Sequence, residues 1–102
     1  MNIKFEYCYR DGANYKNIDS EVFSNKSASK LKDIDAAIKK ALIDGEWFYA
    51  DRWNLKNLYE FKFDVSIDHG WHEFSSVEET NDDSTKGDIA DFLLLIHRNK
   101  AI

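Results

Sequence analysis

The chain has 102 residues, a length that suits one domain, residues 1–102, with a single hydrophobic core. Its one cysteine excludes an internal disulfide and any metal cluster built from several cysteines. The net charge of −5 is uneven, because residues 1–62 carry 11 Lys/Arg and 10 Asp/Glu whereas residues 63–102 carry 3 and 9. No basic cluster of the kind that binds phosphates is visible, so direct nucleic-acid binding is not expected.

Two features of the sequence predict where the protein works. A lone cysteine and a start without an apolar leader segment, MNIKFEYCYR, indicate a protein of the reducing cytoplasm. The longest apolar run, Phe92–Ile96, is too short to span a bilayer, so no membrane partner is expected.

The first two elements are predicted to be strands. Residues 2–10 alternate, with one face made of Ile3, Phe5, Tyr7 and Tyr9 and the other of Lys4, Glu6, Cys8 and Arg10. This period of two is typical of a strand with one buried side. Asp11 and Gly12 then favour a turn, and a second strand is expected within Tyr15–Ser24.

The next segment has the period of a helix. Apolar residues recur at three- and four-residue steps, at Leu31, Ile34, Ile38 and Leu42. Ser27 or Ser29 is expected to cap the start of this helix, and Gly45 stands where a left-handed residue would end it.

Three further strands are predicted after the helix. The segment EWFYADRW, residues 46–53, would place Trp47 and Tyr49 on one face and Phe48 and Ala50 on the other. A strand that is apolar on both faces belongs in the middle of a sheet. The other two strands are expected at residues 59–63 and 71–77, where aromatic and polar residues alternate.

A loop and a helix complete the predicted fold. Residues 79–88 form a solvated loop, in which Thr85 and Asp88 have the spacing of a capping box. The final helix would bury Ile89, Phe92, Leu93 and Ile96. The order β-β-α-β-β-β-α predicts an α+β fold, a two-layer sandwich of a mainly antiparallel sheet with helices on one face.

The segment DHGWHEF, residues 68–74, concentrates the residue types of metal and catalytic sites. Two histidines can share a zinc ion when they lie one helical turn apart. On a strand, however, His69 and His72 would point to opposite faces, because residues three apart alternate. We therefore expect no metal site and no catalytic residue here. Instead, Trp71 and Phe74 would anchor the strand, and the polar residues between them would hydrogen-bond a neighbouring loop.

The segment YRDGANYKN, residues 9–17, is a second candidate site. Arg10, Asn14 and Tyr15 cluster beside a tight turn, where they could bind an anion or another polar ligand. The alternative interpretation is a hairpin whose tyrosines flank the turn.

The tryptophans form a third candidate, since aromatic residues are common both in cores and in protein interfaces. Trp53 is expected to be the most exposed of the three, because it lies between Arg52 and Asn54 in a polar connection. Trp71, within DHGWHEF, is a second binding candidate.

Taken together, the segments YRDGANYKN, IDGEWFYADRW and DHGWHEF resemble a family of small, uncharacterised bacterial proteins of about this length. The resemblance implies a bacterial or mobile-element origin, and it implies that the three segments act together, as one surface. It assigns no activity, cofactor or catalytic residue.

Two functions are compatible with these patterns. The first is a non-enzymatic protein-binding domain, such as an immunity protein, antitoxin or phage-type inhibitor, that uses Asp82 and Asp83 to dock on a basic partner. The second is a small polar-ligand-binding or enzymatic domain with a pocket lined by Arg10, Tyr15, His69 and His72. No cofactor is expected, and a homodimer is a further alternative.

Overall fold

The computed structural model of the chain describes residues 1–10, 16–58 and 71–99. Its elements are β1 (Asn2–Arg10), β2 (Lys16–Phe23), α1 (Leu31–Ala41), β3 (Trp47–Tyr49), the 3-10 helix η1 (Ala50–Trp53), β4 (Trp71–Thr80) and α2 (Ile89–Arg98). The predicted α+β class and the antiparallel sheet are confirmed. The strand predicted at residues 59–63 lies outside the described residues, so the full element order stays a prediction.

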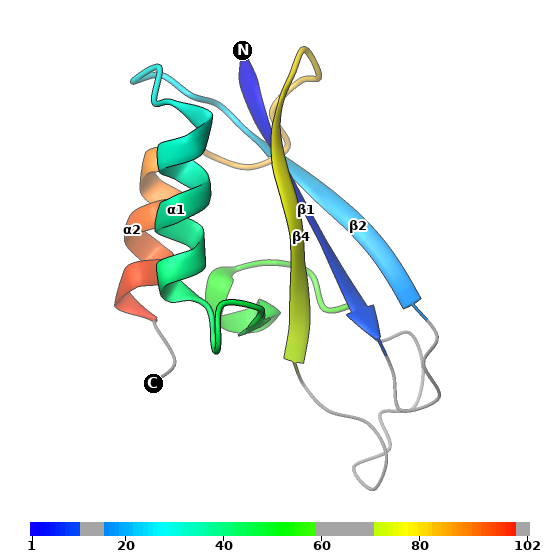
Figure 1. Ribbon diagram of the computed structural model, residues 1–102. Coiled ribbons are helices and arrows are strands. Elements are labelled where there is room, and N and C mark those ends of the chain that lie inside the picture. The colour runs from blue at the N-terminus through cyan, green and yellow to red at the C-terminus, as the bar shows by residue number, and fades with distance from the viewer. Residues whose placement is uncertain (11–15, 59–70, 100–102) are drawn as a thin grey trace, which may run out of the picture.

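The four described strands form one antiparallel sheet in the order β2-β1-β4-β3 (Figure 1). The sequence predicts EWFYADRW in the middle of a sheet, whereas among the described strands β3 stands at the edge and pairs with β4. The two faces of β3 are apolar for different reasons. Phe48 enters the core, while Trp47 packs on Trp71 on the opposite side of the sheet.

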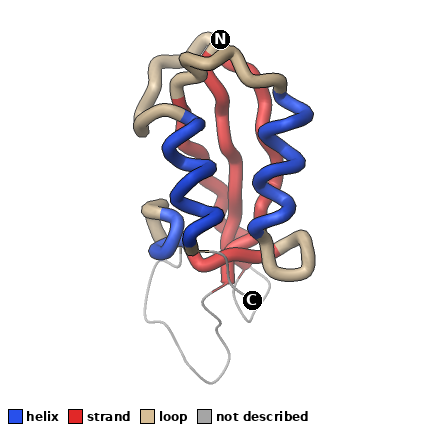
Figure 2. Tube along the Cα trace, turned by 90° about the vertical axis from the view of Figure 1, so that its left-hand side faces the viewer, coloured by secondary structure: helices blue, strands red, loops and turns tan. Residues whose placement is uncertain are grey.

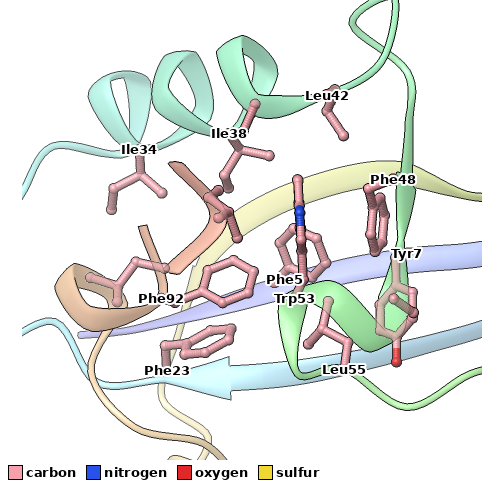
Figure 3. Close-up of a cluster of buried hydrophobic side chains, with 14 of the residues drawn as sticks. Phe5, Tyr7, Phe23, Ile34, Ile38, Leu42, Phe48, Trp53, Leu55 and Phe92 are labelled. Carbon is pink, nitrogen blue, oxygen red and sulfur yellow. The ribbon is translucent and has the colours of Figure 1, made fainter. Parts of the chain in front are cut away.

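Both helices lie side by side on the same face of the sheet (Figure 2). We call this face the inner face and the opposite one, which neither helix covers, the outer face. The apolar residues of β1 alternate as predicted, and Ile3, Phe5, Tyr7 and Tyr9 are all buried on the inner face. The helices contribute their predicted apolar stripes, so that the core between the helices and the sheet includes Ile34, Ile38, Ile89, Phe92 and Ile96 (Figure 3).

A β-bulge in β4 aligns its two ends with the core. Along β1, Glu6 lies opposite Ser76 and Tyr7 lies opposite Phe74, so Ser75 is an extra residue. Phe74 and Val77 are three residues apart and would otherwise point to opposite faces. With the bulge, both pack against the core.

The start of α1 differs from the prediction. Neither Ser27 nor Ser29 caps it, because the N-cap position is Lys30, which makes no side-chain capping bond. Asn25 uses the backbone of Ser29 instead: its Oδ1 accepts from the Ser29 N–H and its Nδ2 donates to the Ser29 carbonyl, both at 3.0 Å.

Gly45 adopts the left-handed conformation, but in a turn and not at the helix end. Asp44 and Gly45 have φ values of 51° and 71°. Two successive left-handed residues suit a tight reversal. The turn brings Ile43 opposite Trp47, whose carbonyl accepts from the Ile43 N–H at 2.7 Å.

The capping box predicted before α2 does not form. Asp88 itself is the N-cap and accepts a hydrogen bond from the Ala90 N–H at 3.1 Å. The Thr85 hydroxyl instead accepts from the Val22 N–H and donates to Glu21, each at 2.9 Å. The loop before α2 is thereby tied to β2. Among the described residues, neither helix is long and apolar enough to cross a membrane.

Candidate functional site

His72, the central residue of DHGWHEF, has a structural role in the core. Its side chain is fully buried, and its ring lies 5.1 Å from that of Tyr9 and 5.9 Å from that of Phe48. Nε2 accepts a hydrogen bond from the Leu58 N–H at 3.0 Å, so this nitrogen carries no proton. The prediction that the polar residues between Trp71 and Phe74 hydrogen-bond a neighbouring loop is confirmed for His72, whereas Glu73 pairs with Arg10 of β1.

Two more side chains hold the same loop against the inner face. The Tyr7 hydroxyl donates to the Lys56 carbonyl, and Asn17 Nδ2 donates to the Leu58 carbonyl, both at 2.7 Å. Burial raises the pKa of Tyr7, and the negative charges of Asp19 and Glu21 raise it further. The phenol therefore keeps its proton and remains a hydrogen-bond donor.

The prediction that Trp53 is exposed is wrong, because only 2% of its surface is accessible. After β3 the chain tightens into η1, and this turn directs the indole into the core. There the ring stacks on Phe48 at a centroid distance of 4.4 Å and meets Phe92 edge-on at 5.9 Å (Figure 3). Trp53 is thus part of the packing of the core.

Trp71, unlike Trp53, lies outside the core. The sequence predicts it both as an anchor of its strand and as a binding residue, and in the structure it projects from the outer face and is 36% exposed. Its ring stacks against Trp47 at 5.5 Å, and its Nε1–H donates to the Tyr49 hydroxyl. The Arg52 guanidinium lies 4.9 Å from the centre of the Tyr49 ring. We call Trp47, Tyr49 and Trp71 the aromatic patch.

The geometry of the aromatic patch suits contact with another protein. The stack of Trp47 and Trp71 occupies one face of each ring and fixes their orientation. The indole N–H of Trp71 already has an acceptor in Tyr49. An aromatic cluster that is held in place in this way suits contact with an apolar protein surface.

Charged groups border the aromatic patch. Arg10 Nε pairs with Glu73 Oε2 at 3.2 Å on the outer face.

Cys8 lies on β1 between β2 and β4, opposite Ile18 and Glu73, and is buried. Burial raises the pKa of the Cys8 thiol and the charge of Glu73 raises it further, so the thiol stays protonated and is a poor nucleophile.

The ligand pocket considered from the sequence is not assembled by its described members. Arg10 lies on the outer face, where it pairs with Glu73, whereas His72 lies on the inner face. Asn14, Tyr15 and His69 lie outside the described residues. In the described part of the chain, no three His, Cys, Asp or Glu side chains are grouped as metal ligands.

Asp82 and Asp83 are both exposed in the loop after β4. The backbone of this loop is held in place, because the Asp82 carbonyl accepts from Asn2 Nδ2 at 2.8 Å and the Asp82 N–H donates to the Thr80 hydroxyl at 3.2 Å. The carboxylates thus extend from an anchored turn at the opposite end of β4 from Trp71.

Trp47 and Tyr49 belong to the aromatic residues that the sequence offers as core or interface, but of these only Trp53 and Trp71 are predicted to bind. The alternation of the segment does separate Trp47 and Tyr49 from Phe48, as the structure confirms. What the sequence lacked was the position of β3 next to Trp71, which depends on pairing across 22 residues of chain.

Comparison of the chain with models of known protein families, with curated proteins and with solved structures found no match. The structure therefore defines the chain as an α+β domain. Its antiparallel sheet is covered by helices on one face and carries the aromatic patch on the other.

Proposed function

We propose that the chain is a non-enzymatic protein-binding domain that docks on a basic partner protein, in the manner of an immunity protein, antitoxin or phage-type inhibitor. The aromatic patch carries this proposal. Tryptophan and tyrosine are the side chains that most often dominate the binding energy of protein interfaces. In the patch they are held by stacking and a hydrogen bond before any partner arrives, which lowers the entropy lost on binding.

The charge of the chain supports a basic partner. The exposed carboxylates of Asp82 and Asp83 extend from an anchored loop, and residues 63–102 hold 9 acidic against 3 basic residues. Complementary charge accelerates the encounter of two proteins and disfavours acidic competitors.

The proposed architecture is the two-layer sandwich in which the helix layer closes the inner face and leaves the outer face for the partner. A reducing cytoplasm is the proposed location, and the burial of the protonated Cys8 thiol is compatible with it. The small-ligand alternative has less support, because Arg10 and His72 lie on opposite faces.

The test compares two exposed hydrophobic residues on different faces. Leu94 on α2 is 60% exposed and serves as the control for Trp71. Each variant, Trp71→Ala and Leu94→Ala, is immobilised beside the original chain, and basic proteins captured from cell extract are quantified by mass spectrometry. We expect a partner that Leu94→Ala retains and that Trp71→Ala binds about 30-fold more weakly, which corresponds to about 2 kcal/mol for an interface anchor. Equal capture by both variants would contradict the proposal.

The contribution of the acidic loop is measured separately, as an association rate. Replacing Asp82 and Asp83 by Asn should slow association with that partner and reduce its dependence on salt. The control removes the same charge elsewhere, by replacing the exposed Asp33 and Asp44 with Asn. If both double variants slow association equally, net charge and not the loop attracts the partner.

A further inference from the structure

A cavity of about 200 Å³ opens on the helix side of the molecule, away from the aromatic patch. It lies between the end of β2, η1, the start of α2 and the loop that joins β4 to α2. Its lining consists of Phe23, Trp53, Asn54, Lys86, Gly87, Asp88, Asp91, Phe92 and Leu95. This volume matches one large amino-acid side chain.

The floor of the cavity is aromatic and rigid. Phe23 stacks on Phe92 at 4.4 Å, and Trp53 meets Phe92 edge-on at 5.9 Å. All three rings belong to the core and are almost completely buried. A ligand would therefore meet a preformed apolar surface.

The rim of the cavity is charged and has an acidic excess. Asp88 and Asp91 supply two carboxylates, whereas Lys86 supplies one ammonium group. The Lys86 ammonium donates to the Asn54 carbonyl at 2.7 Å, which holds it on one side of the rim.

Asp88 is kept ionised by its neighbours. Its Oδ1 accepts from the Lys26 N–H at 2.9 Å and from the Ser24 hydroxyl at 2.8 Å, and these bonds lower its pKa together with the bond from Ala90. Asp91, one turn before Leu95 on α2, is exposed and adds a second negative charge at the opening.

We propose that this cavity binds an arginine side chain of a protein that docks on the helix side of the domain. The inference goes beyond the proposed function, because it concerns the side opposite the aromatic patch. The apolar stem of arginine would lie on the aromatic floor. Its planar guanidinium can bond a carboxylate at the rim through two N–H groups, which a lysine ammonium cannot do.

Gly87 allows the cavity to be narrowed without strain. It lines the cavity, its φ is outside the left-handed range, and a Cβ added to it would meet no atom within 4 Å. Gly87→Leu can therefore place a larger side chain at the rim without a steric clash at Cβ.

The test uses a small probe in place of the partner. N-acetyl-arginine N-methylamide is titrated into the isotope-labelled full chain, and the amide signals of Asn54 and Gly87 and the methyl signals of Leu95 are followed by NMR. The matched probe is N-acetyl-citrulline N-methylamide, which has nearly the same shape without the charge. We expect saturable shifts at these three residues with the arginine probe and binding about two- to fivefold weaker with citrulline, as for an exposed ion pair.

Charge variants should shift the affinity for the arginine probe in opposite directions. Asp91→Asn should weaken binding and Lys86→Gln, which retains a donor for the Asn54 carbonyl, should strengthen it, each by about two- to fivefold. Gly87→Leu should abolish saturable shifts. Asp33, the acidic residue in the first turn of α1, is the control, and Asp33→Asn should leave the affinity unchanged.

Three results would overturn the assignment: no saturable shifts at the cavity, equal affinity for the two probes, or equal weakening by Asp33→Asn and Asp91→Asn. Because no partner is present in this titration, its failure is distinct from failure of the aromatic patch to bind a protein. Conversely, if no variant of the aromatic patch reduced capture of a partner, the proposed function would fail, but the result with the arginine probe would still stand.

Discussion

The two faces of the sheet contain the same kinds of side chain and use them differently. On the inner face, Trp53 and Phe48 stack at 4.4 Å and are enclosed by the helix layer. On the outer face, Trp47 and Trp71 stack at 5.5 Å, and Trp71 remains 36% exposed. Stacking alone therefore does not distinguish a core from an interface, whereas the layer that covers the stack does.

The faces also differ in how their polar groups are satisfied. On the inner face, His72 and Tyr7 bond backbone groups of the loop at residues 56–58, which buried polar atoms require. On the outer face, Arg10 pairs with Glu73 at the border of the aromatic patch, where water can compete. We therefore expect changes to the inner face to alter folding and changes to the outer face to alter binding.

The largest expected effect is the difference between two tryptophan truncations. Trp53→Ala should reduce the free energy of unfolding by about 3–5 kcal/mol, because it removes a buried indole and leaves a cavity. Trp71→Ala should reduce it by about 1 kcal/mol or less, since the side chain lies outside the core, is 36% exposed and leaves no enclosed cavity when it is removed. Urea denaturation followed by circular dichroism measures both values. Similar losses for the two variants would show that the outer face is structural.

The sequence predicted the core residues of β1 and α2 but not the position of Trp53. The strict alternation of β1 and the helical stripe of α2 identified their buried residues, because each pattern is local. Trp53 could not be placed in this way, since its direction depends on η1 and on the rings it meets from β3 and α2. A tertiary contact decided its burial against a polar local context.

The aromatic patch depends on long-range features of a similar kind. The alternation around Phe48 separated Trp47 and Tyr49 from the core, but the pairing of β3 with β4 put them beside Trp71. The extra residue Ser75 is equally necessary, because it lets Trp71 and Phe74 keep their faces while Val77 points inward. A serine pair in a strand carries no local signal for a bulge.

A smaller loss of stability should follow when His72 is replaced by Phe. The ring would still fill the space between Tyr9 and Phe48, but Nε2 would no longer accept from the Leu58 N–H. A buried N–H without an acceptor costs about 1–3 kcal/mol. Hydrogen exchange of the Leu58 amide should accelerate together with the drop in stability. Unchanged exchange would mean that this bond does not hold the loop on the inner face.

Replacement of Asp88 should lower the free energy of unfolding by a still smaller amount, and this loss should depend on pH. Three hydrogen bonds to its carboxylate lower its pKa in the folded chain below the value near 4 expected when unfolded. The charged form thus stabilises the fold above the unfolded pKa, and this contribution disappears as the pH falls through the folded pKa. Asp88→Asn should therefore cost about 0.5 kcal/mol at pH 7 and almost nothing near pH 2, because Asn also caps helices and Asp88 is partly exposed to water.

Thermal unfolding of the two proteins between pH 7 and pH 2 measures this difference. A constant gap across the range would contradict the assignment, since it would show that the charge of Asp88 does not matter. The same variant also removes one of the two carboxylates at the rim of the cavity.

The smallest expected effect on stability concerns the ion pair of Arg10 and Glu73. Arg10 Nε lies 3.2 Å from Glu73 Oε2, but 42% of the Arg10 side chain and 31% of the Glu73 side chain are exposed. A double-mutant cycle with Arg10→Gln and Glu73→Gln should therefore give a coupling of about 0.2–0.5 kcal/mol that decreases in high salt. A coupling above about 2 kcal/mol would place the pair in a desolvated setting and remove the distinction between the two faces. If the coupling is small, these two charges are free to act on the partner, because an ion pair that adds little to folding can still orient a protein that docks beside it.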